Sequence, residues 1–285
     1  MAEVGDAFSV GDYPGEFARV ATLLFQNIRW DDYQNYKSFD LVFGYHFVIL
    51  VKLGRHAEYT DLLARYEKTV SSRNARFVNY CDLQTYMHWV NEEYSEAIKW
   101  GLRGKELKDR SDVDTKFGTD HNLALAQRDA GIVDPALAYF LRGRKLDEVI
   151  DVDELDEDRG GAYYGNIGRC LHLMGQVDPA LICYRKSAIL IEKDQKVNNT
   201  ENKAFARKWI GELLVVRGQY CVAKTFFEAS RQKWEVVSPL RIAEIDRLLN
   251  SIRDKTSDCA ALKGEDVERY CIAWIFGRET EFQPL

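Results

Sequence analysis

The sequence GAYYGNIGRCLHLMGQVDPALICYRKSAIL, residues 161–190, decides the fold of this chain. It places a small residue at Gly168, a turn residue at Gly175, a second small residue at Ala180 and an aromatic ring at Tyr184. Small residues let two helix backbones approach closely, and a large ring fills the space beside them. The stretch therefore predicts two antiparallel helices that pack tightly and stack on similar pairs.

The same pattern recurs along the chain. The sequence VDPAL occurs at residues 133–137 and again at 177–181, each time after a turn glycine and before an aromatic residue. A third copy begins at Gly218, and an earlier one begins at Tyr94. A single hairpin cannot bury its apolar face alone, so at least three must stack. We therefore predict an all-α fold made of stacked hairpins.

Helix boundaries follow from the turn signals. Each Asp-Pro pair supplies an N-cap carboxylate and a proline at the first helical position, and the preceding glycine ends the previous helix. Together with the apolar periodicity, these signals predict helices at residues 15–28, 38–53, 56–70, 75–91, 94–109, 115–130, 134–150, 159–174, 178–194, 200–217, 220–236, 239–253 and 258–276.

The repeat resembles the tetratricopeptide (TPR) motif, W-x2-L-G-x2-Y followed by A-x3-F and P. The positions that match are Tyr164, Ile167, Gly168, Leu171, Ala180 and Tyr184. A period of about 38–44 residues is similar to that of kinesin light chains, LGN-type spindle adaptors and sensor arrays of bacterial signalling ATPases. The resemblance implies a right-handed α-solenoid of TPR hairpins over residues 38–236, with capping segments at 1–37 and 237–285.

The resemblance also implies a concave peptide-binding groove. In those families an asparagine on this face bonds to the backbone of a bound peptide, and Asn122 and Asn166 match it two residues before the small position of their helices. The equivalent residues are Trp209 in the next repeat and Leu83 in the previous one. This pattern indicates a polar centre flanked by apolar pockets. Alternatively, each asparagine bonds to a neighbouring helix or faces solvent.

Helical periodicity extends the predicted face. The full predicted peptide-binding set is Tyr86, Trp89, Asn122, Arg128, Asn166, Arg169, His172, Trp209 and Glu212. Aromatic, arginine and amide side chains are typical of recognition surfaces. Two alternatives stay open. The aromatic pair in this set could pack against an adjacent helix, and the two arginines could form internal ion pairs instead of binding a ligand.

The sequence carries no pattern that favours catalysis, a cofactor or a metal. The acidic run at 147–158 lacks the glycine of a calcium loop, and the spacing of GAYYGNIG does not fit a dinucleotide-binding loop. The five histidines lie far apart in the sequence, and Cys170 and His172 point to different sides of a helix. We therefore predict that the chain is not an enzyme and that the acidic run is a solvated loop.

Composition narrows the class of partner. A net charge of −6 argues against nucleic-acid binding. The most apolar run, residues 41–51, is too short to span a membrane and indicates a core helix.

Six scattered cysteines predict buried thiols in a reducing compartment. The first residues show no signal peptide, so we expect a cytoplasmic protein.

Two functions agree with these features. The first is non-catalytic recognition of a protein or peptide segment in the groove. The second is a sensor or scaffold array that controls an effector domain or a partner. The sequence alone leaves both open, because this architecture is a binding surface that unrelated systems share.

Overall fold

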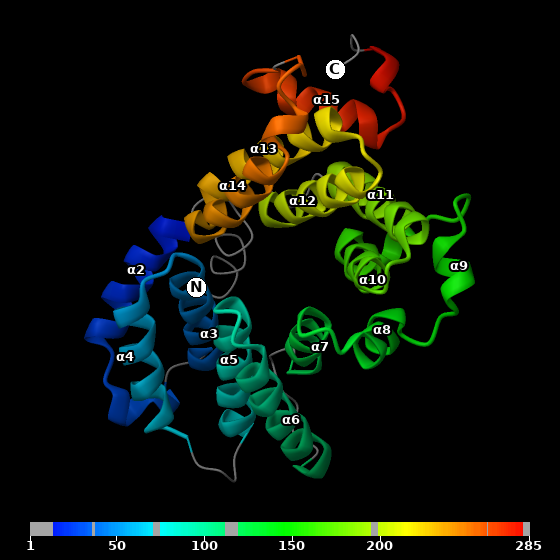
Figure 1. Cartoon of the computed structure of the whole chain (residues 1–285). Helices are drawn as coiled ribbons and strands as arrows, with labels where there is room; N and C mark the ends of the chain where they lie inside the picture. Colours follow the sequence, from blue (N-terminus) through cyan, green and yellow to red (C-terminus); the bar gives the residue numbers. More distant parts are fainter. Residues whose placement is uncertain are drawn as a thin grey trace. The chain divides into compact units, whose positions relative to one another are not determined.

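The computed structural model describes residues 14–35, 38–70, 75–111, 119–194, 199–260 and 262–281 (Figure 1). Over these residues the chain is helical and contains no strand. It divides into two compact units, residues 1–139 and 140–285. The division into a cap, an array and a second cap remains a prediction.

Unit 1 packs its helices mainly on their neighbours in the chain, with α5 and α7 also in contact. An aromatic cluster forms its core, where the rings of Phe43 and Tyr66 stack at 4.3 Å and Phe25 meets Phe43 edge-on. The elements of this unit are α2 (Pro14–Asn27), η1 (Trp30–Asn35), α3 (Phe39–Lys52), α4 (His56–Glu67), α5 (Ala75–Val90), α6 (Tyr94–Ser111), α7 (Thr119–Asp129) and α8 (Val133–Leu141), whose last two residues fall in unit 2.

Unit 2 repeats the hairpin arrangement, with extensive packing between α10 and α11 and between α12 and α13. Its elements are α9 (Leu146–Ile150), η2 (Glu157–Arg159), α10 (Gly161–Leu173), α11 (Val177–Lys193), α12 (Thr200–Val216), α13 (Tyr220–Val237), η3 (Pro239–Arg241), α14 (Ile242–Ser251), η4 (Arg253–Lys255), α15 (Glu265–Ile275) and η5 (Glu279–Glu281).

Most predicted helices are confirmed to within a few residues. The helix predicted at 258–276 begins only at Glu265, and the clearest difference lies at residues 134–150. The predicted single helix ends at Leu141, and a short second helix begins at Leu146. Arg142 and Gly143 have φ angles of 49° and 81°, in the left-handed region that interrupts a right-handed helix. Gly143 tolerates this backbone, but the sequence pattern gave no signal that Arg142 would adopt it.

The close hairpin contact is confirmed at two equivalent positions. A Cβ atom added to Gly168 would lie 2.7 Å from the Tyr184 ring, and one added to Gly211 would lie 2.6 Å from the Phe227 ring. Both rings are fully buried. The two contacts lie at the same place in the α10–α11 and α12–α13 hairpins. A glycine at this position is therefore a requirement of packing and not a source of flexibility.

The ring of Tyr184 also joins one hairpin to the next. It stacks on Trp209 of α12 with ring centroids 5.6 Å apart and planes at 21°. The prediction that this aromatic position fills the space between successive pairs is thus confirmed for these two hairpins. Tyr184 contacts both α10 and α12, so a single residue determines how two hairpins approach each other.

The last long helix, α15, is held against α11 and α12 by hydrogen bonds from two arginine side chains. Arg207 of α12 donates to both carboxylate oxygens of Glu268, at 2.6 and 2.9 Å, and to Glu192 of α11 at 2.7 Å. Arg185 donates to the carbonyl oxygens of Trp274 and Ile275 at the end of α15. Because Arg207 has no exposed surface, these carboxylates are required to balance its charge.

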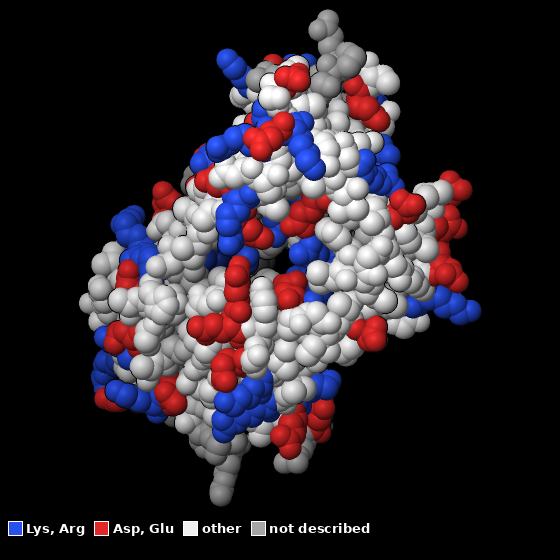
Figure 2. Space-filling view, viewed as in Figure 1, with Lys and Arg blue, Asp and Glu red and all other residues white. Residues whose placement is uncertain are grey.

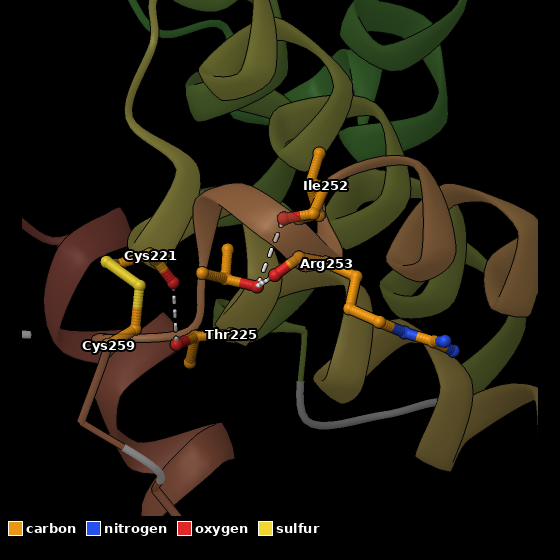
Figure 3. Close-up of a disulfide and its surroundings, with 6 residues drawn as sticks. Cys221, Thr225, Ile252, Arg253 and Cys259 are labelled. Atoms are coloured by element: carbon orange, nitrogen blue, oxygen red, sulfur yellow. Dashed lines mark hydrogen bonds between the residues drawn. A yellow bond between two sulfur atoms is a disulfide. The ribbon is translucent and has the colours of Figure 1, made fainter.

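The prediction of six free thiols is wrong for one pair. Cys221 and Cys259 form a disulfide, with their Cα atoms 5.5 Å apart (Figure 3). They are separated by 38 residues, and only the return of the chain through α14 brings them together. The other four cysteines, Cys81, Cys170, Cys183 and Cys271, are buried free thiols. The cysteine pattern therefore no longer supports a reducing compartment, and a cytoplasmic location remains a prediction.

The apolar run at 41–51 lies in α3, where its side chains contribute to the core of unit 1, as predicted. None of the helices in the described segments combines the length and the hydropathy that crossing a bilayer requires.

The packing at Gly168 gives a direct test. We expect Gly168→Ala to lower the free energy of unfolding by about 1–3 kcal/mol, because the new methyl group overlaps the buried Tyr184 ring. This loss should exceed the gain of about 1 kcal/mol that alanine normally brings within a helix. Urea titration followed by circular dichroism measures the difference.

Gly15→Ala is the matched control for this experiment. Gly15 lies in α2 with no atom within 4 Å of an added Cβ, so this variant should be as stable as the wild type or slightly more stable. If Gly168→Ala were as stable as Gly15→Ala, the hairpin would have room for a methyl group beside the Tyr184 ring, and the need for glycine at position 168 would be disproved.

Candidate functional site

Two polar cross-links join α5 and α7 in unit 1. The Nδ2 atom of Asn122 donates to Oδ1 of Asp82 at 3.0 Å, and Nε1 of Trp89 donates to Oδ2 of Asp129 at 2.8 Å. The partners on each helix are seven residues apart and so share one helix face. The predicted residues Trp89 and Asn122 therefore lie on neighbouring faces, each bonded to a carboxylate of the other helix.

Arg128 is buried in an internal ion pair. Its Nε and Nη2 atoms donate to the two oxygens of Asp129 at 2.8 and 2.7 Å, so Asp129 binds Arg128 and Trp89 together. The structure thus agrees with the internal alternative for this arginine. Tyr86 is half-buried, and its ring lies 5.8 Å from that of Trp89.

Asp82 is a residue that the sequence analysis missed. Its side chain is 3% exposed and accepts the hydrogen bond from Asn122, whereas the repeat pattern identifies only its neighbour Leu83, as the repeat-equivalent of Asn122. Burial raises the pKa of Asp82 from its usual 3.8 to about 7, although the hydrogen bond from Asn122 acts in the opposite direction. A carboxylate inside a largely apolar helix was the signal available, because aspartate is unfavourable there without a partner.

Unit 2 carries a similar polar cross-link between α10 and α12. The Nη1 atom of Arg169 donates to Oε2 of Glu212 at 2.6 Å, and Nδ1 of His172 lies 3.8 Å from the same oxygen. The same Nδ1 atom lies 3.3 Å from the Tyr184 hydroxyl. Burial, and then the charge of Arg169, lower the pKa of His172, which favours the neutral ring at pH 7.

The remaining predicted residues of unit 2 are mostly enclosed. Asn166 is buried on α10, and Trp209 is buried on α12 against Tyr184. The nine predicted residues thus form two groups, one in each unit. In the first group Asn122 and Arg128 bond to carboxylates of the chain, and in the second Arg169 bonds to Glu212.

Two apolar side chains next to the unit 2 group are open to solvent. Leu173 is 41% exposed and Val216 is 62% exposed. They lie seven residues after Asn166 and Trp209, so they continue the helix faces that carry Arg169 and Glu212. The Arg169–Glu212 ion pair therefore has an accessible apolar residue beside it on each helix.

The acidic run is occupied by internal ion pairs. Arg144 lies within 3.4 Å of carboxylate oxygens of Glu148, Glu154 and Asp156. Among the described residues, no cluster of three or more His, Cys, Asp or Glu side chains has the arrangement to hold a metal ion. On the face drawn in Figure 2, Lys and Arg side chains are interspersed with Asp and Glu side chains.

A comparison with protein-family models finds no match for this chain, and no curated protein matches its sequence.

The burial of Asp82 predicts a specific pH dependence. Folding raises its pKa to about 7, so its contribution to stability is complete below about pH 4 and is lost as the pH rises through 7. Between these two pH values the contribution of Asp82 to the free energy of unfolding falls by as much as about 4 kcal/mol. We expect Asp82→Asn to remove this loss, as measured by urea titrations at several values between about pH 4 and about pH 8.

Asp134→Asn provides the control, because Asp134 is exposed at the start of α8. It should keep the pH dependence of the wild type. An Asp82→Asn protein whose stability varies with pH as the wild type does would show that Asp82 is ionised at neutral pH.

Proposed function

We propose that the chain is a non-catalytic interaction module, an α-solenoid of TPR-like hairpins. It binds a peptide or protein segment along the faces of the first helix of each hairpin, such as α10 and α12. The observation that carries this proposal is the exposure of Leu173 and Val216 at equivalent positions of α10 and α12. Both flank the Arg169–Glu212 ion pair. Apolar contacts beside a fixed polar pair are the composition expected of a recognition surface.

The repeat geometry supports the TPR-like part of this proposal. The Gly168–Tyr184 and Gly211–Phe227 contacts recur at the same position of successive hairpins. Each first helix also ends in the same way, because Gly175 and Gly218 adopt positive φ angles of 75° and 74°. Repeated contacts of this kind favour an array that continues from one hairpin to the next.

The internal bonding assigns different roles to the predicted residues. Asn122 and Arg128 already bind buried or half-buried carboxylates, so in our proposal they hold the helices in place and do not clamp a peptide. Arg169 and Glu212 are partly exposed and orient the ligand. Because their side chains are ordered before binding, association loses less conformational entropy than it would with free side chains.

Affinity then comes from the apolar side chains. A ligand that covers Leu173 and Val216 removes apolar surface from water, which contributes about 25 cal/mol per Å². The preferred ligand is accordingly a segment with an apolar side chain next to polar groups that bond to Arg169 or Glu212. A regulatory array acting on an effector remains the alternative, and it does not require this face to bind a free peptide.

Selection from a displayed random-peptide library tests the proposal. Selected peptides would be labelled, and their binding to the purified chain measured by fluorescence anisotropy. We expect the double variant Leu173→Ser/Val216→Ser to bind them at least about tenfold more weakly, a loss of about 1.4 kcal/mol. Circular dichroism must first show that the variant and the wild type are equally folded.

Val152→Ser is the matched control, because Val152 is 68% exposed in the same unit but lies between α9 and η2. It should bind the peptides as the wild type does. Equal binding by all three proteins would place the ligand on another surface, and failure to select any peptide would favour the regulatory alternative.

A further inference from the structure

The disulfide links the start of one helix to a distant short segment. Cys221 is the second residue of α13, whereas Cys259 follows η4, and the bond between their sulfur atoms joins the two (Figure 3). The rest of α13 and the whole of α14 lie between them in the sequence. The bond therefore fixes the position of residues 253–260 relative to the first turn of α13.

The noncovalent contacts described for this segment are modest. Lys255 donates to the hydroxyl of Tyr220 at 2.9 Å and lies 4.4 Å from the centroid of its ring. Thr256 is buried, and its hydroxyl bonds to the carbonyl oxygens of Ile252, just before the segment, and of Arg253, so neither bond reaches α13. Ile252 is buried and anchors the beginning of the segment. The disulfide is thus a principal connection of its far end to α13.

A pocket of about 420 Å³ is lined by residues of α13, of the end of α14 and of this segment. Lys224 and Glu228 belong to α13, whereas Arg253 and Thr256 belong to the segment. Lys224 and Glu228 follow Cys221 by three and seven residues, so all three lie on one face of the helix. Displacement of residues 253–260 would remove one wall and expose this face.

The two bridged cysteines differ from the free ones in accessibility. Both are only partly buried, so a small thiol can reach them. The free cysteines are all buried, and burial raises the pKa of Cys81 to about 11 and that of Cys183 to about 12. Thiol–disulfide exchange requires a thiolate and access to the sulfur. Exchange would therefore be selective for the Cys221–Cys259 pair.

We propose that the Cys221–Cys259 bond is a reversible redox switch that holds residues 253–260 against α13 when oxidised and releases them when reduced. The oxidant is a low-molecular-weight disulfide of the glutathione class. One protein thiolate attacks it and releases one thiol, and the second thiolate then displaces the other thiol from the mixed disulfide. The protein loses two electrons and two protons, and the small disulfide becomes two thiols. The reverse reaction opens the pocket wall. This proposal is independent of the peptide-binding function.

Redox titration combined with hydrogen exchange tests the switch. The full chain would be equilibrated in glutathione buffers of increasing reducing strength, with the bond measured by differential alkylation and mass spectrometry. We expect the pair to convert between its two states within the range of these buffers. On reduction, amide exchange at residues 253–260 should accelerate by at least about tenfold, while exchange in α10 and α11 stays unchanged.

Two variants separate the switch from general effects of the buffer. Cys221→Ser/Cys259→Ser should show fast exchange at residues 253–260 in every buffer. Ser257→Ala alters the same wall without removing a thiol, and it should keep the redox response of the wild type.

Three outcomes would overturn the proposal. The bond could resist the most reducing glutathione buffer, it could open without any change in exchange at residues 253–260, or its reduction could unfold the whole of unit 2. The first and third outcomes would make the bond a permanent structural cross-link, and the second would leave it without influence on the pocket wall.

Discussion

The structure of unit 2 depends on the close approach of helix backbones at Gly168 and Gly211. Each glycine lies against a buried aromatic ring, with no room for a Cβ atom. Close packing at this point fixes the separation of the two helices in a hairpin, and the Tyr184 ring then sets the distance to the next hairpin through Trp209. Packing inside the α10–α11 hairpin thereby sets the position of the α12–α13 hairpin.

Polar cross-links between first helices add a second constraint. In unit 1 the pairs Asn122–Asp82 and Trp89–Asp129 connect α5 to α7, and in unit 2 Arg169–Glu212 connects α10 to α12. A buried polar group without a partner is costly, so each pair favours one register of its two helices. The same bonds leave fewer polar atoms for a ligand. Residues of the types found at recognition surfaces thus bond helices together in this chain.

The second half of unit 2 is held by longer-range connections. Arg207 joins α12 to α11 and α15 through Glu192 and Glu268, and the disulfide joins α13 to the segment after η4. The first is enclosed, so breaking it would leave a buried charge. The second is accessible and can be broken by a chemical reaction without creating a charge in the core. The Arg207 ion pairs are therefore suited to permanent structure, whereas the disulfide is suited to the reversible switch that we propose.

The sequence by itself determined the helical hairpins, because small residues facing aromatic residues at a fixed spacing let two helices pack closely at those positions. It also located most helix ends, since turn glycines act locally. The predicted Asp-Pro caps are wrong by one residue, because α8 begins at Val133 and α11 begins at Val177, each with its Asp already inside the helix. Tertiary structure alone decided the partners of the polar residues, as with Asp82 opposite Asn122 and Arg128 against Asp129. It also decided the Cys221–Cys259 bond. Such pairings depend on which helix faces meet, and that depends on the packing of residues far apart in the sequence.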